Sequence, residues 1–84
     1  MTGDGPSYRV EVRDGAVGTV HDVEVPADVA ERLGWDPARR DELVQASFEF
    51  LLEREPATSI LRRFDLEVVG RYFPEFPAEI SRRA

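Results

Sequence analysis

His21 is the only histidine in the sequence, so it would have to supply the histidine base of any hydrolytic triad. Such a site also needs a nucleophile beside the base, and none of the four serines stands in a recognisable nucleophile motif. A metal site made by His21, Asp22 and Glu24 is disfavoured, because strand alternation sends the imidazole to the opposite face from the two carboxylates. Without cysteine, the chain also lacks thiol chemistry. We therefore expect no catalytic residue, no metal and no cofactor, and interpret His21 as a strand residue stacked near Tyr8.

Three arginines in the second half of the chain are candidates for binding an anion: Arg62, Arg63 and Arg71. A guanidinium group matches a carboxylate or phosphate with paired hydrogen bonds, and all eleven cations of the chain are arginine. The alternative is a solvated face on which these arginines pair with Asp65 and Glu67. Of the two, the solvated face is the favoured interpretation, and the three arginines are the predicted contact for any anionic partner.

The net charge of −6 argues against nucleic acid as that partner. Residues 1–55 carry thirteen acids against six arginines, whereas residues 56–84 carry four acids against five arginines. An acidic surface repels phosphate backbones and releases few counterions on binding them. A strand and two helices over residues 21–55 do match the order of ribbon-helix-helix DNA-binding regulators and antitoxins, but the strand offers a DNA groove only Asp22, Glu24 or valines. That class stays open as the alternative.

The elements that must position these residues begin with a hairpin. Residues 1–6 are expected to form a flexible tail, and residues 7–13 ("SYRVEVR") then alternate between apolar and charged side chains, as a half-buried strand does. Asp14-Gly15 predicts a two-residue turn into a second strand that ends before Pro26. The predicted facing pairs are Val12 with Val17, Val10 with Thr19 and Tyr8 with His21.

Two helices are predicted after the hairpin, over residues 27–34 and from Pro37 to about residue 55. Gly34 supplies the left-handed stop of the first helix, and Asp36 supplies the N-cap of the second. Apolar side chains cover about two-thirds of the circumference of the second helix. A helix this apolar packs on two sides, so we expect it to be the central element, with Phe48 and Leu51 almost fully buried.

Residues 60–76 are predicted to close the core as an aromatic clasp. Ile60, Leu61 and Phe64 share one face of the segment, and Asp65 caps a further short helix. The apolar arc of that helix comprises Leu66, Val68, Val69, Tyr72 and Phe73. Pro74 and Pro77 force extended or turning chain, in which Phe76 folds back over the core.

Together these elements predict an α+β fold, in which an N-terminal two-stranded antiparallel β-hairpin packs on three to four helices. One domain is expected over residues 7–84, after the tail. No run approaches the ~20 apolar residues that a membrane helix needs, and the N-terminus lacks the basic and apolar segments of a signal peptide. We expect a cytoplasmic protein without membrane contact.

The second half of the chain carries a resemblance. Its words "FLLERE", "SILRRFDL" and "RYFPEF" are similar to those in a group of short, uncharacterised bacterial proteins of actinobacterial type. The similarity covers about a third of the chain. It implies a small free-standing domain from a bacterium with a GC-rich genome, and it implies no activity, ligand or site residue.

These observations favour a non-catalytic module that binds another protein. A two-stranded hairpin is marginal alone and leaves both outer edges unpaired, so we also expect self-association into a homodimer. The alternatives are a ribbon-helix-helix regulator and, as a third class, a small enzyme.

Overall fold

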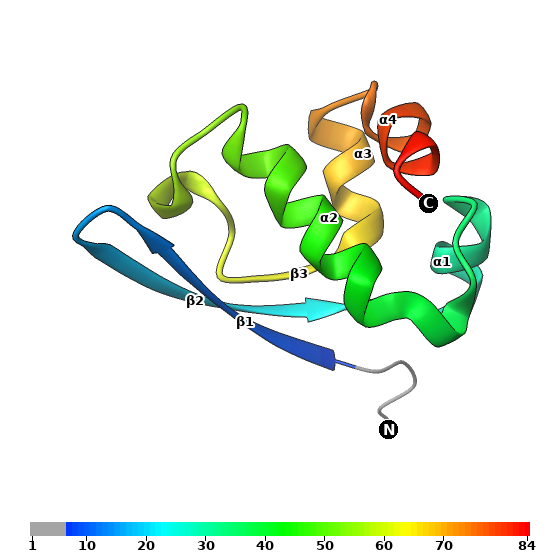
Figure 1. The fold of residues 1–84 in the computed structure, drawn as a ribbon, viewed down its shortest axis with the longest axis horizontal. Coiled ribbons are helices and arrows are strands. Elements are labelled where there is room, and N and C mark those ends of the chain that lie inside the picture. The colour runs from blue at the N-terminus through cyan, green and yellow to red at the C-terminus, as the bar shows by residue number, and fades with distance from the viewer. Residues whose placement is uncertain (1–6) are drawn as a thin grey trace.

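The computed structural model describes residues 7–84, so the predicted tail of residues 1–6 lies outside the described residues. The strands are β1 (Ser7–Asp14), β2 (Val17–Glu24) and β3 (Arg63–Asp65). The helices are α1 (Ala27–Arg32), α2 (Arg40–Leu52), α3 (Val69–Tyr72) and α4 (Phe76–Arg82), and short 3₁₀ turns occupy Pro37–Arg39, Ala57–Ser59 and Leu66–Val68. The helices lie on one face of the sheet (Figure 1). The α+β class is confirmed, with a three-stranded mixed sheet in place of the predicted two strands.

The hairpin of β1 and β2 is confirmed, but its predicted register is wrong by two residues. Val12 lies opposite Thr19, Val10 opposite His21 and Tyr8 opposite Val23. The predicted Asp14-Gly15 turn is also wrong, because the closing pair Asp14↔Val17 leaves Gly15 and Ala16 as the turn residues. Gly15 has a positive φ of 66° and Ala16 does not, as in a type II′ turn. A shift of two residues keeps every side chain on its own face, so apolar alternation cannot distinguish the two registers.

The strand β3 adds to the predicted hairpin. It runs parallel to β2, with Phe64 paired to Val23. The N–H of Asp22 donates to the carbonyl of Arg62 at 2.7 Å, which extends the ladder to the residue before β3. The chain here is therefore extended and not helical, because its backbone groups pair with the outer edge of β2.

The helix α2 is central, as predicted, and lies between the hairpin and the helices α3 and α4 (Figure 1). The ring centroid of Phe48 lies 5.3 Å from that of His21 and 6.1 Å from that of Phe64. The ring centroid of Phe50 lies 5.9 Å from that of Phe73 and 5.1 Å from that of Phe76. Phe48 thus packs on the sheet and Phe50 on the C-terminal helices. Phe48 and Leu51 are each 4% exposed, which confirms packing on two sides.

The predicted stop at Gly34 and cap at Asp36 are confirmed, but Asp36 caps a 3₁₀ turn, and α2 begins at Arg40 and not at Pro37. Gly34 follows α1 with a φ of 82°, in the left-handed region. The carboxylate of Asp36 accepts a hydrogen bond from the N–H of Ala38 at 2.9 Å, and Pro37 opens the 3₁₀ turn that leads into α2. α2 ends at Leu52, earlier than predicted.

The prolines at positions 74 and 77 predict turning chain, but a helix, α4, begins at Phe76. Pro77 is accommodated because it occupies the first turn, where the missing N–H has no helical partner to lose. The indole N–H of Trp35 donates to the carbonyl of Ile80 at 2.9 Å and anchors this helix. Phe76 is 1% exposed, which confirms that it folds back over the core.

Arg54 links the end of α2 to the start of α4. Its guanidinium carbon lies 3.6 Å from the ring centroid of Phe50, and its Nε lies 3.2 Å from the carboxylate of Glu75. A backbone hydrogen bond and the hydrogen bond from Arg54 hold the pKa of Glu75 below its ordinary value. The lowered pKa of Glu75 stabilises the fold at pH values above the ordinary carboxyl pKa, and this stabilisation is lost as the pH falls through the lowered pKa. The stabilisation is small because Arg54 and Glu75 are exposed to solvent.

Candidate functional site

His21 is a structural residue in the core. It is fully buried, its Nδ1 lies 2.8 Å from the carbonyl oxygen of Leu61, and its Nε2 lies 2.8 Å from the hydroxyl oxygen of Thr19. A carbonyl can only accept, so Nδ1 carries a hydrogen and donates it to Leu61. The strand position of His21 agrees with the sequence, whereas the predicted neighbour Tyr8 is wrong, since the ring that contacts His21 is that of Phe48.

We expect His21→Leu to lower the free energy of unfolding by about 1–3 kcal/mol, because the Leu61 carbonyl and the Thr19 hydroxyl would each lose a buried partner. Thr19→Val, which removes only the hydroxyl, should have a smaller effect. Urea denaturation of the two variants and the parent measures the difference. A His21→Leu protein as stable as the parent would show that these hydrogen bonds do not hold β2 to the segment before β3.

The arginines predicted to contact an anionic partner are all exposed, but they do not share one surface. Arg63 lies beside the inward-facing Phe64 in β3, so its side chain points to the outer face of the sheet. Arg71 lies in α3, on the face of the sheet that the helices cover (Figure 1). Arg62 lies directly before β3. Within residues 7–84, none of these three side chains forms an ion pair.

The predicted pairing of these arginines with Asp65 and Glu67 does not occur in residues 7–84. The carboxylate of Glu67 lies 2.7 Å from Arg32 of α1. The carboxylate of Asp65 accepts a hydrogen bond from the N–H of Glu67 at 2.9 Å, as the predicted cap. Arg62, Arg63 and Arg71 are thus exposed and form no ion pair within residues 7–84, and their contact with an anionic partner stays a prediction.

Two members of the predicted clasp are exposed, which corrects that prediction. Tyr72 is 66% exposed and Leu61 is 48% exposed. Tyr72 lies at the edge of the predicted apolar arc, because at about 100° per residue it is about 120° from Leu66, whereas Phe73 is about 20° from Leu66. Leu61 turns outward because it lies in extended chain next to the inward-facing Ile60.

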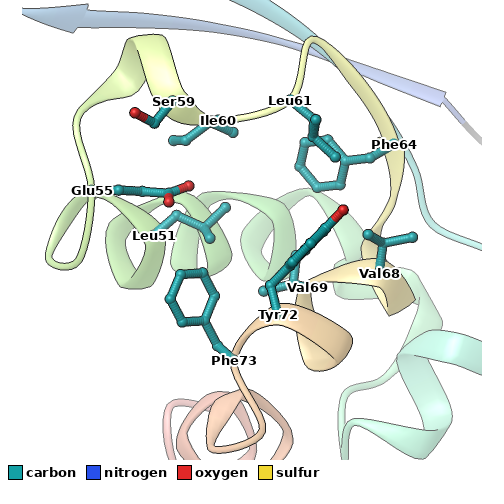
Figure 2. Close-up of a pocket in the computed structure, with 10 residues that line it drawn as sticks. All are labelled: Leu51, Glu55, Ser59, Ile60, Leu61, Phe64, Val68, Val69, Tyr72 and Phe73. Carbon is teal, nitrogen blue, oxygen red and sulfur yellow. The ribbon is translucent and has the colours of Figure 1, made fainter.

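These two side chains stand at the mouth of an apolar pocket, which we call the Tyr72 pocket. Its volume is about 410 Å³. Its lining residues are Leu51, Glu55, Ser59, Ile60, Leu61, Phe64, Val68, Val69, Tyr72 and Phe73. They come from the end of α2 and the chain that follows it, from β3 and the residues directly before it, and from the region between the 3₁₀ turn of Leu66–Val68 and the residue after α3. The ring of Tyr72 stands up from α3 toward Leu61 and Phe64 (Figure 2).

Polar groups are few in the Tyr72 pocket. The Glu55 carboxylate points into it, and the Ser59 hydroxyl points away from it (Figure 2). Tyr72 adds a phenol hydroxyl on the opposite wall. This arrangement suits an apolar group with a hydrogen-bond donor beside it, because the carboxylate can only accept when it is ionised. No group of three or more His, Asp or Glu side chains that could hold a metal occurs in residues 7–84.

The pairing of β2 within the sheet argues against the ribbon-helix-helix alternative. In that class, one strand pairs with its copy across a two-fold axis. The Asp22–Glu24 part of β2 is flanked by β1 on one edge and by β3 on the other. No edge is left there for a second copy.

Comparison with known protein families, with curated proteins and with solved structures gave no match to this chain. The resemblance to short actinobacterial proteins therefore stays a prediction. No helix within the described part of the chain is long and apolar enough to cross a membrane.

Proposed function

We propose that this protein is a non-catalytic module that binds another protein, and that the Tyr72 pocket receives an apolar side chain of that partner. The observation that carries the proposal is the exposure of Tyr72 at 66% and Leu61 at 48%, at the mouth of one apolar pocket. Apolar anchors that fill such pockets supply much of the binding energy of protein interfaces, and tyrosine is prominent among the residues that contribute it. His21 supports a non-catalytic role, because both of its ring nitrogens are engaged in the core.

Charge around the Tyr72 pocket favours a partner with acidic residues beside its apolar anchor. Arg62 follows Leu61 and Arg71 precedes Tyr72 in the chain, so each of the two mouth residues has an exposed cation next to it in sequence. Guanidinium groups at a rim mainly raise the rate of association and fix orientation, since solvent screens them. Glu55, inside the pocket, can accept a hydrogen bond from a backbone amide of the bound segment.

The experiment is a selection of displayed random peptides on the immobilised full chain. Peptides with a large apolar residue next to Asp or Glu should be enriched. They should bind Leu61→Ala/Tyr72→Ala at least about tenfold more weakly, which corresponds to losing about 1.4 kcal/mol at the anchor. The matched control is Val17→Ala/Val20→Ala, which removes two exposed apolar side chains of β2, 44% and 39% exposed, and should bind like the parent.

The arginine variant Arg62→Ala/Arg71→Ala should bind the same peptides more weakly than the parent at low salt, with the difference shrinking as salt is added. Enriched peptides that bind all of these proteins equally would contradict the proposal, as would a selection in which no peptide is enriched.

A further inference from the structure

The outer edge of β1 is the longest unpaired strand edge within residues 7–84. β1 has eight residues, and an unbroken ladder from Ser7↔Glu24 to Asp14↔Val17 pairs its other edge with β2. The strand contains no proline and no bulge, which are devices that commonly protect an edge. Such an edge offers its backbone N–H and C=O groups to another strand.

Hairpin geometry identifies the residues whose backbone groups face outward. In a hairpin with a two-residue turn, the closing pair Asp14↔Val17 exchanges hydrogen bonds, and bonded pairs then alternate with non-bonded ones. The non-bonded residues of β1 are Ser7, Arg9, Glu11 and Arg13. Asp22, the partner of Arg9, gives an independent check, because its N–H donates to the carbonyl of Arg62 on the β3 side at 2.7 Å.

The side chains of this edge are complementary to themselves in one register. We propose that two copies of the chain pair antiparallel through β1, with Val10 on the two-fold axis, to form a continuous sheet with three strands from each copy. This register sets Arg9 opposite Glu11 of the second copy, twice by symmetry, at positions whose backbone groups both face the edge. Opposite charges at facing positions on one face of a sheet attract.

The neighbouring registers are poorer. An axis at Glu11 places the two Glu11 side chains opposite each other and Arg9 opposite Arg13, so that like charges meet. An axis at Val12 pairs only the positions from Val10 to the end of the strand at Asp14, whereas an axis at Val10 pairs all the positions from Ser7 to Arg13. Registers without an axis on a residue would set inward side chains opposite outward ones.

Pairing with a second copy would also bury more of the inner, apolar face of β1. Tyr8 and Val10 are half-buried beside a groove of about 510 Å³ that runs between β1 and α2. Leu52 of α2 lines this groove and is 38% exposed. With the axis at Val10, Val12 of the second copy lies opposite Tyr8 and extends the apolar face past the edge. This interface is separate from the Tyr72 pocket, so the test of the dimer and the test of the pocket are independent of each other.

Charge exchange tests the register. Analytical ultracentrifugation of the full chain should find a dimer, and Arg9→Glu or Glu11→Arg alone should weaken it by about tenfold or more, because each sets like charges together twice. The double variant Arg9→Glu/Glu11→Arg restores the opposite charges and should restore the dimer. A parent that stays monomeric at millimolar concentration would overturn the proposal, and so would a double variant no stronger than the single ones.

Cross-linking gives a second readout, because the chain has no cysteine of its own. In the proposed register, the two copies of residue 10 form a non-bonded pair with Cα atoms about 4.5 Å apart, within disulfide range. Val10→Cys should therefore oxidise to a covalent dimer much faster than Val20→Cys, an exposed control on β2. Equal rates would overturn the interface, and faster linking by Val12→Cys than by Val10→Cys would overturn the register.

Discussion

Replacing Phe76 with alanine is expected to lower the free energy of unfolding by about 3–5 kcal/mol. Phe76 is 1% exposed, and its ring centroid lies 5.1 Å from that of Phe50, so truncation leaves a cavity where the C-terminal helices meet α2. A domain of this size has a total stability of about 5–10 kcal/mol, so much of the variant should be unfolded at moderate temperature. Urea denaturation followed by circular dichroism measures the loss.

The matched control for this prediction is Tyr72→Ala, on the preceding helix. Tyr72 is 66% exposed, so its truncation should change the free energy of unfolding by no more than about 0.5 kcal/mol. If Tyr72→Ala proved as destabilising as Phe76→Ala, the assignment of Phe76 to the core and Tyr72 to the binding surface would be wrong.

Phe48→Ala is the second substitution with a large expected effect, again about 3–5 kcal/mol. Its ring packs against His21 of β2 and Phe64 of β3, so the cavity would open between α2 and the sheet. Leu52→Ala, one turn further along the same helix, is the control. Leu52 is 38% exposed, so this substitution should lower the free energy of unfolding much less than Phe48→Ala does. Thermal and urea melts that do not separate the two variants would contradict the packing of α2 against the sheet.

The sequence predicts the parts of this fold that depend on local signals. Gly34 and Asp36 mark helix boundaries through backbone conformation and capping, which neighbouring residues determine. The central position of α2 follows from apolar residues on most of its circumference. The face of each strand in the hairpin follows from alternation, which is why Val10 points inward in the structure even though its partner was predicted wrongly.

The parts that the sequence does not predict depend on distant partners. β3 is only three residues long and exists because β2, some forty residues earlier in the chain, offers it an edge. α4 starts among prolines that suggest a break, and it is stabilised by the hydrogen bond from Trp35 to Ile80, which no local pattern reveals.

The candidate site was missed for a geometric reason. The aromatic density of "RYFPEF" points to this region, but an α-helical arc assigns Tyr72 to the core. The arc is broad, and at about 100° per residue Tyr72 lies at its edge, about 120° from Leu66, whereas Phe73 lies about 20° from Leu66. Phe73 and Phe76 pack against Phe50 in the core, and Tyr72 is left at the mouth of the pocket.

The central claim, that a partner's apolar side chain binds in the Tyr72 pocket, is tested most directly by NMR titration of the ¹⁵N-labelled full chain with a peptide from the selection. We predict saturable shifts of the amide signals of Leu61, Val69 and Tyr72, and saturation only at about tenfold or more higher peptide concentration when the Leu61→Ala/Tyr72→Ala variant is titrated. Shifts confined to the hairpin, or equal shifts in parent and variant, would contradict the claim.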